Sequence, residues 1–438
     1  MQDNNINPFS SKRTTYLLYL LIMFGCVARL WEVWTHNPMD HLFSDPLRHW
    51  EHARATLSAS PMAIIDPPFY QIWLSIIQKW SLGLPVLIAI YAGTLSVATP
   101  WLWYRFLRES LHSKTLALTG WVLLVWLPTW IGIFDYFMTE TLLLPLLGAS
   151  LWTTSRARRK HTVAAFVQMV VFWTLTGFAR TIAFPLGGLA GFWVWTSHPY
   201  KLRCIGWTTL ILVITMGPLA YRNNYYTHML SPFGSGWLNR IYAESGKRTI
   251  SLHIIRDDAQ WYYSFSSPSI NRTPLWPFSN WTLSRTGTVN VFADLSNSEE
   301  DWRKAYEQTR VEGAERWKLH WENMLIVMVG DSWPDDNQAY LSGRASVDFR
   351  WPWIPLFLLI VGIGIWRWRD TLQRPLLPML IVTWFLLQAC SLLVVNEGRY
   401  RKPFEGLLVA QLLMIIDQKR QSTARKLSIG ITQIQFSN

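Results

Sequence analysis

Membrane-length apolar runs constrain the fold of this chain more than any other feature of its sequence. Half of the 438 residues are hydrophobic, and windows close to the length of a bilayer-spanning helix recur along the chain. The mean hydropathy is only +0.12, because the long polar segment 225–350 dilutes the average. The pattern predicts an all-α integral membrane bundle with a mixed domain outside the membrane. In that domain we expect irregular structure with short strands, followed by a helix from Ser298 to Val329.

We expect about ten transmembrane helices. Residues 69–80 are also apolar, but this segment is short and carries Lys79, so we expect it to lie along the membrane interface. The count rises to eleven or more if that segment crosses the bilayer or if the chain contains a further, broken span. The predicted spans are approximately 15–34, 85–106, 116–134, 141–154, 163–177, 182–196, 205–221, 351–366, 375–395 and 403–416.

Basic residues fall in alternate loops, with the densest run at 156–160. By the positive-inside rule, both termini lie in the cytoplasm and residues 225–350 lie outside, and we favour a bacterial inner membrane. The chain then has three parts. These are an N-terminal transmembrane module (1–224) with a candidate catalytic first outer loop (35–82), an extracytoplasmic domain (225–350), and C-terminal transmembrane helices with a cytoplasmic tail (351–438).

Two classes of protein are disfavoured by charge and by cysteine usage. The net charge is +12, but the Lys and Arg residues sit between apolar runs and form no basic domain, so we expect no nucleic-acid partner. Cys26, Cys204 and Cys390 all fall inside apolar runs, and their spacing shows neither a disulfide framework nor a cysteine metal site.

The first outer loop concentrates ionisable residues between two apolar runs. A helix that begins at Pro46 would place Asp45, Arg48, His49 and His52 on one face, at i, i+3, i+4 and i+7. A carboxylate, a cation and two imidazoles on one face suit proton transfer and phosphate binding at a membrane surface. The alternative is that Asp45 only caps the helix, since Asp before Pro is a common helix start.

Cations at the outer ends of several spans form a second pattern. Ionisable groups at a membrane boundary are costly unless they are paired or used, and arginines with carboxylates suit a lipid-phosphate site. The alternative is interfacial snorkelling and structural ion pairing. The cations are Arg48, Arg54, Arg180, Arg222, Arg399, Arg401 and Lys402, and the carboxylates beside them are Asp45, Glu140 and Glu397.

Four stretches together resemble the GT-C superfamily of membrane glycosyltransferases. Asp45, with an aromatic residue shortly after it and Ala53 further on, resembles the acidic motif of the family's first loop. Asp66-Pro67-Pro68-Phe69-Tyr70 is similar to its His-Pro-Pro-aromatic stretch, with Asp in place of His. Thr139-Glu140 matches an acidic position before the fourth span. The run 397–404 resembles its Glu-x-Arg-Tyr-Arg-x-Pro motif.

Within that superfamily the chain is most similar to glycosyltransferase family 39, the group of protein O-mannosyltransferases and lipid A aminoarabinose transferases. Arg180 and the stretch from Pro218 to Asn223 add weaker matches. The resemblance implies transfer of a hexosyl or pentosyl group from a polyprenyl-phosphate donor to a lipid, glycan or protein acceptor. The chain has Asp45-Pro46 where the family has Asp-Glu, and the missing second acid weakens the case for a metal.

The implied roles follow the chemistry of a glycosyl phosphate, which carries its own leaving group. Asp45 would be the general base of an inverting transfer, helped by His49 or Glu140, and arginines would stabilise the departing phosphate. A divalent cation, Mg²⁺ or Mn²⁺, could sit between Asp45 and Glu140. The expected substrate-binding residues are Arg48, Asp66, Tyr70, Arg180, Arg222, Glu397, Arg399, Tyr400, Arg401 and Lys402.

The late motif carries a structural expectation of its own. In an extended stretch Arg399 and Arg401 would face the same side, since side chains alternate with a period of two, and both would grip one phosphate. Two other functions stay open, a lipid-linked-sugar flippase or polar-solute transporter and a non-catalytic scaffold. Charge near mid-span and internal repeats would favour a transporter, whereas here the charges gather at span ends.

Overall fold

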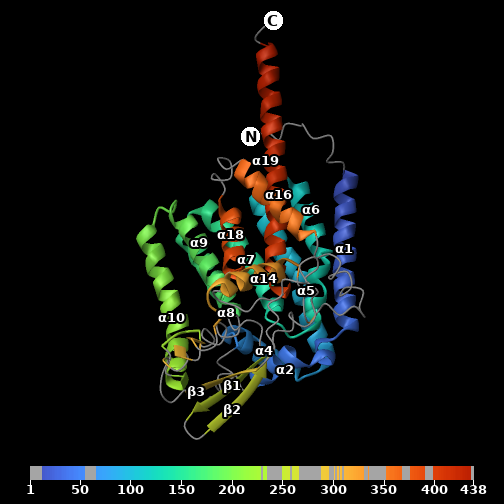
Figure 1. The fold of residues 1–438 in the computed structure, drawn as a ribbon. Helices are drawn as coiled ribbons and strands as arrows, with labels where there is room; N and C mark the ends of the chain where they lie inside the picture. Colours follow the sequence, from blue (N-terminus) through green and yellow to red (C-terminus); the bar gives the residue numbers. More distant parts are fainter. Residues whose placement is uncertain are drawn as a thin grey trace.

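The protein is a helical bundle with a small β-sheet at one end, as seen in a computed structural model (Figure 1). The described start of α1 and the end of α19 lie at the other end of the bundle from the sheet and α2. The structure describes residues 12–54, 66–227, 230–233, 249–256, 259–265, 288–294, 300, 303–304, 306–307, 310–329, 334, 352–366, 375–389 and 398–435, with only the backbone of the three strands.

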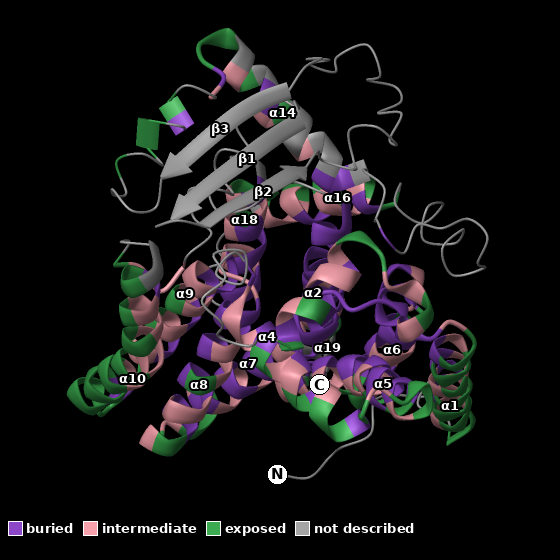
Figure 2. Ribbon diagram, turned by 90° about the horizontal axis from the view of Figure 1, so that it is seen from below, coloured by how far each residue is buried: buried purple, intermediate pink, exposed green. Residues whose placement is uncertain are grey.

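Among the described residues, three helices are long and apolar enough to cross a membrane: α1 (Lys12–Thr35), α5 (Pro85–Ser110) and α10 (Lys201–Thr227). Shorter apolar helices are α8 (Val163–Ala179), α9 (Ala183–Trp195), α16 (Trp353–Trp366) and α18 (Leu376–Ala389). Figure 2 shows α1 and α10 at opposite edges of the bundle, with exposed outer faces. Such faces suit contact with lipid, because lipid tails are as apolar as the side chains.

The segment predicted as one span, 116–134, is apolar enough to cross a membrane only as a bent pair of helical segments. Helix α6 (Lys114–Val125) ends before two 3₁₀ turns, η2 (Pro128–Trp130) and η3 (Gly132–Asp135), and the two parts are bent by 66°. Pro128 explains the break, because proline lacks an N–H and disfavours helical backbone at the residue before it.

The predicted single helix from Ser298 to Val329 is interrupted. Residues 300, 303–304 and 306–307 are helical as expected. Helix α14 begins only at Ala314 and ends at Val329. Residues 310–312 are non-helical, and Gly313 has a φ of +62°, a left-handed conformation that glycine adopts without strain. The short strands expected in this region are present as β1 (Thr249–Arg256), β2 (Ala259–Phe265) and β3 (Thr288–Asp294).

The three strands form one sheet in the order β2-β1-β3. Strands β1 and β2 pair antiparallel, and Arg256 lies opposite Ala259, so only residues 257 and 258 connect them. Strand β3 pairs with β1 in parallel, with Ile250 opposite Val289. A parallel pair needs a long crossover, which accounts for the separation of β3 from β2 along the chain.

The centre of the bundle is formed by α5, α7 (Glu140–Lys160) and the first turns of α19 (Arg401–Gln435). Glycines let these helices approach closely. A Cβ on Gly148 of α7 would lie 2.6 Å from the Trp103 side chain and 3.1 Å from its backbone N, and one on Gly406 of α19 would lie 2.7 Å from Trp103 and Trp130. Both indoles are fully buried, so they cannot easily move aside.

Candidate active site

The first outer loop forms two short helices that pack on one another. Helix α2 (Ser44–Arg54) and helix α4 (Pro68–Ser81) meet where Gln78 donates to the Trp50 carbonyl at 2.5 Å. The Trp50 ring stacks on Phe137 at 4.5 Å, which fixes α2 against the segment before α7. The predicted helix through Asp45, Arg48, His49 and His52 is therefore confirmed. Residues 69–80 fall within α4, and their expected place along the membrane interface stays a prediction.

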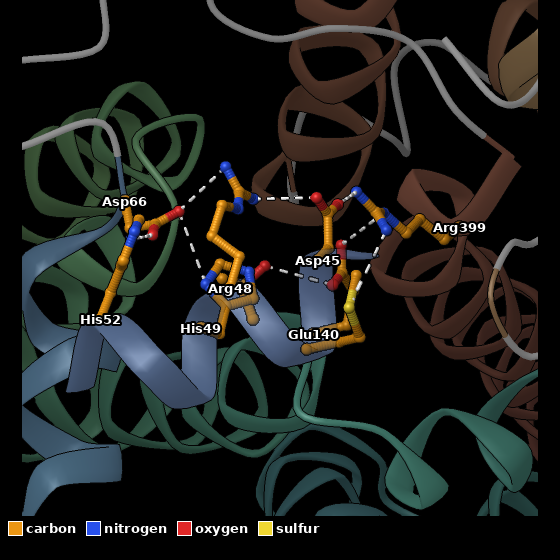
Figure 3. A network of polar contacts seen from close by, with 9 residues as sticks. Asp45, Arg48, His49, His52, Asp66, Glu140 and Arg399 are labelled. Atoms are coloured by element: carbon orange, nitrogen blue, oxygen red, sulfur yellow. Dashed lines mark hydrogen bonds and ion pairs between the residues drawn. The ribbon is translucent and has the colours of Figure 1, made fainter. Parts of the chain in front are cut away.

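Asp45 lies in the first turn of α2, not before it, so it is not the residue that precedes the helix. Its carboxylate takes two ion pairs. Oδ1 lies 3.0 Å from Arg48 and Oδ2 accepts from Arg399 at 3.2 Å (Figure 3). Burial alone would raise the pKa of Asp45, but Arg48 and Arg399 hold it below its usual value. Asp45 is consequently ionised at neutral pH.

Arg399 connects Asp45 to Glu140, which begins α7. Its Nε lies 3.8 Å from the Glu140 carboxylate, and its Nη1 contacts the Met138 sulfur at 4.0 Å. Glu140 is fully buried, and Arg180 pairs with its Oε1 while Thr139 donates to its Oε2 at 3.1 Å. The site therefore brings together four segments that are distant in the sequence, those of Asp45, Glu140, Arg180 and Arg399.

Tyr400 lies against both arginines of this cluster. The Arg180 guanidinium is 3.7 Å from the centre of the Tyr400 ring, and that of Arg399 is 5.3 Å from it. Both distances fall within cation–π range. The ring thus holds two cations close together, each of which also faces the Glu140 carboxylate.

Asp66 is the centre of the second half of the network. Its buried carboxylate accepts from His52 at 2.6 Å and lies 3.4 Å from Arg48 and 3.5 Å from His49. Burial alone would raise the pKa of Asp66, but Arg48 and the two imidazoles hold it well below its usual value. Burial lowers the pKa of His49 to about 4, so His49 is neutral at physiological pH. Arg48, shared by Asp45 and Asp66, joins both halves.

Tyr70 and Arg222 take less direct positions. Tyr70, on α4, is fully buried, and its ring meets His49 edge-on at 5.2 Å between the centroids. It therefore supports the imidazole. Arg222 lies near the end of α10, on a different segment of the chain from the ion-paired residues of the site. Glu397 lies outside the described residues.

The expected extended conformation of the late motif is wrong. Residues Gly398–Tyr400 form a 3₁₀ turn, and α19 begins at Arg401. Arg401 Nε donates to Glu405 at 2.8 Å, and its Nη1 donates to the Val327 and Met328 carbonyls of α14 at 3.2 and 3.1 Å. Arg401 therefore faces away from the partners of Arg399 and ties α19 to α14.

Lys402 is also bound to protein groups. It is 1% exposed, its ammonium donates to the Thr129 carbonyl, and its own carbonyl accepts from Trp130 at 2.9 Å. Thr129 in turn donates its hydroxyl to Glu405. Arg401, Lys402 and Glu405 thus form a buried structural cluster beside the candidate site, and the expected phosphate-binding role of the first two is not supported by their contacts.

The space between Asp45 and Glu140 contains the Arg399 guanidinium. A divalent cation there would have to displace this group, and the cation stays a prediction. A different group among the described residues has the side chains of a metal site: Glu32, His36 and Asp135, whose ligand atoms lie within 4.8 Å of one another.

Two contributors were given no catalytic or binding role from the sequence, although His52 was placed on the candidate helical face. His52 completes the contacts of Asp66, and its position at i+7 from Asp45 was the signal that pointed to it. Glu405 neutralises Arg401, four residues before it on the same helix. That i, i+4 spacing is visible in the sequence and is typical of a pair that stays within one helix.

No model of a known protein family matches the sequence, and a search of curated proteins found no match. The resemblance to the GT-C superfamily therefore depends on the motifs and on the convergence of their residues in space.

Proposed function

We propose that this protein is a membrane glycosyltransferase that moves a sugar from a polyprenyl-phosphate donor to an acceptor hydroxyl outside the cytoplasm. The convergence of Asp45, Arg399, Glu140 and Arg180 carries the proposal. Asp45, Glu140 and Arg399 come from three of the stretches that resemble the family, and Arg180 is one of its weaker matches. In this site, ionised carboxylates lie beside guanidinium groups. That combination provides a proton acceptor next to phosphate ligands.

Asp45 is the proposed general base and Arg399 the proposed phosphate ligand. Asp45 is ionised and its side chain is 21% exposed, so an acceptor hydroxyl can reach it. Its low pKa reflects its two arginines. If the donor phosphate draws Arg399 away from Asp45, the carboxylate loses one stabilising cation and becomes more basic. Donor binding would thus prepare Asp45 to accept the proton.

The charges of the site suit this reaction. The network contains three carboxylates, Asp45, Asp66 and Glu140, and three guanidiniums, Arg48, Arg180 and Arg399, with His49 neutral. During transfer the acceptor oxygen bonds to the anomeric carbon as the bond to the phosphate oxygen breaks. The phosphate gains one negative charge, and Asp45 loses one by taking the hydroxyl proton, so the total charge of the site is unchanged. One-step displacement inverts the anomeric centre.

The proposal includes the membrane arrangement predicted from the sequence. About ten spans would place both termini in the cytoplasm of a bacterial cell and α2, α4 and residues 225–350 on the periplasmic side. In support, the described ends of the chain lie away from α2 and the sheet. Cysteine labelling from outside the cell tests this: Ser298→Cys should react, and reaction of Ser155→Cys would contradict it.

A reconstituted transfer assay tests the chemistry. We expect the purified protein in lipid nanodiscs to consume a polyprenyl-phosphate-linked sugar, with an Asp45→Asn variant slower by roughly two to four powers of ten. Arg159→Gln is the matched control, because Arg159 is 60% exposed and pairs with Glu109 away from the site. Asn has nearly the size of Asp, and its carbonyl oxygen can still accept a hydrogen bond from Arg399, so the variant should fold. A transfer rate of Asp45→Asn equal to that of the wild type would remove Asp45 from the mechanism. Movement of the intact donor across the bilayer without sugar transfer would instead favour a flippase.

A further inference from the structure

Three side chains of the kinds that bind metal ions meet where the end of α1 approaches η3. Glu32, His36 and Asp135 each offer one ligand atom, and these atoms lie within 4.8 Å of one another. Glu32 and His36 are one helical turn apart, because the His36 amide donates to the Glu32 carbonyl at 2.8 Å, so they lie on the same side of α1. Asp135 is the last residue of η3, in a distant segment of the sequence. The tertiary fold therefore assembles this group.

Other contacts hold both halves of the group in place. Arg29 of α1 is completely buried and donates to the Trp130 carbonyl at 3.1 Å, which ties α1 to the turns that lead to Asp135. In the other half, His41 Nδ1 lies 3.0 Å from the Asp135 carbonyl oxygen, and the His41 ring stacks on Tyr136 at 4.8 Å between the centroids. Ligands on fixed elements lose little freedom when an ion binds, which favours binding.

The charge of the group suits a divalent cation. Two carboxylates and an imidazole carry a charge of −2 when the carboxylates are ionised and the imidazole is neutral, and one divalent cation balances it. An ion pair between Glu32 and His36, at 3.9 Å, would not require the Asp135 carboxylate beside it. Asp135 is only 1% exposed, whereas the Glu32 and His36 side chains are 16% and 23% exposed, so an ion with a bound water can enter from their side.

The ligand atoms favour zinc over calcium or magnesium. Calcium and magnesium take oxygen ligands, whereas zinc accepts imidazole nitrogen together with carboxylate oxygen and often has three protein ligands and a water. Bonds of about 2.0–2.1 Å in a tetrahedron place the ligands of zinc roughly 3.4 Å apart. The three atoms, which lie within 4.8 Å of one another, would have to approach by about 1.4 Å at most, a change that small side-chain rotations provide.

We propose that Glu32, His36 and Asp135 bind a zinc ion that joins the end of α1 to η3. This site goes beyond the proposed function and does not depend on it. The ion would stabilise the segment that follows η3, in which the Met138 sulfur lies 4.0 Å from Arg399 Nη1. Its role is structural, since its ligands are distinct from the carboxylates of the candidate active site.

Zinc binding by the purified full chain in lipid nanodiscs tests the site. After treatment with a chelator, titration with Zn²⁺ against a fluorescent zinc indicator should show one tight site per chain. We expect Asp135→Asn and His36→Gln each to bind at least about 100-fold more weakly, because even partners of metal ligands contribute 10–100-fold. Asp40→Asn is the matched control, since Asp40 is an exposed carboxylate of the same loop outside the group, and it should bind like the wild type.

X-ray absorption by the zinc-loaded wild type keeps the proposal testable if a variant fails to fold. It should show imidazole nitrogen and carboxylate oxygen at about 2.0–2.2 Å and no sulfur. Equal zinc affinity of the wild type and both variants, or sulfur in the shell, would show an adventitious ion only and overturn the site. Loss of zinc in Asp45→Asn but not in Asp135→Asn would place the metal in the candidate active site and also overturn it, as would a wild type that binds no zinc. None of these measurements uses sugar transfer, so their outcome and that of the proposed function are distinguishable.

Discussion

Replacement of Arg401 by methionine should destabilise the fold strongly, although the sequence places Arg401 in the candidate phosphate motif. Arg401 is 1% exposed and makes three hydrogen bonds, one to Glu405 and two to carbonyls of α14. Methionine fills much of the volume but leaves the fully buried Glu405 without its main cation. Breaking a buried pair by removing one partner costs about 3–5 kcal/mol, a change of about two to four powers of ten in the folding equilibrium.

Unfolding of the purified protein in detergent, followed by denaturant or by heat, measures this loss. Arg159→Met is the matched control, since an exposed pair contributes only about 0–1 kcal/mol. The double variant Arg401→Met/Glu405→Met removes both charges and should recover much of the lost stability, because apolar residues often replace a buried pair without loss. An Arg401→Met protein that unfolds like the wild type but has lost donor binding would refute this reasoning and return Arg401 to the phosphate site.

Three further predictions follow from the same contacts. Arg399→Lys keeps the charge, but an ammonium group cannot contact both Asp45 and Glu140 as the planar guanidinium does. We expect wild-type abundance and at least about tenfold slower transfer in the nanodisc assay. An unchanged rate would contradict the assignment of Arg399 to the phosphate site. Burial lowers the pKa of His49 from 6.5 to about 4, so the folded protein binds a proton at His49 less readily than the unfolded chain does. The free energy of unfolding is therefore highest above pH 6.5 and falls as the pH drops from 6.5 to 4. Denaturant unfolding at a series of pH values should show a loss of about 3 kcal/mol that His49→Asn removes, and a pH-independent wild type would contradict it. Gly148→Ala should cost about 1–3 kcal/mol in the same measurement, because the new methyl would meet Trp103, whereas Gly206→Ala should be harmless, and equal stabilities would refute the close packing.

The local structure of the first outer loop was predictable because the spacing of its residues already implied one helical face. Asp45, Arg48, His49 and His52 lie on α2 as expected. The sequence alone did not show that one carboxylate, Asp66, would serve Arg48, His49 and His52 together. That depends on the packing of α4 against α2, which brings residues fourteen or more positions apart into contact and leaves no local periodicity.

The late motif shows how one wrong backbone state changes a functional assignment. An extended stretch would have put Arg399 and Arg401 on one side. In a helical backbone, two residues separated by two positions differ by roughly 200° around the axis, nearly opposite faces. A 3₁₀ turn followed by α19 therefore directs Arg399 to Asp45 and Arg401 to α14. Pro403 is compatible with this, because proline is tolerated in the first turn of a helix.

Arg29 shows what separates a structural arginine from a functional one in this protein. It is a charged residue within the first predicted span and is completely buried. Its guanidinium donates to the Leu124 and Val125 carbonyls at 3.0 and 2.7 Å and to the Trp130 carbonyl at 3.1 Å. These are backbone acceptors around the break after α6, where a helix end leaves carbonyls without partners.

Backbone carbonyls are thus the main acceptors of Arg29 and Arg401. Ser96 Oγ also accepts from Arg29, and Glu405 of the same helix accepts from Arg401. Both arginines are at most 1% exposed, so water does not reach them. Arg399 instead contacts two carboxylates from distant segments, one of which, Asp45, is partly exposed. A phosphate can compete for a guanidinium held by a carboxylate at an accessible edge, because it offers the same geometry with more negative charge. It cannot replace backbone carbonyls without leaving them unsatisfied in the interior. The kind of partner, more than the charge or the motif, therefore favours Arg399 over its neighbour as the ligand of a lipid phosphate.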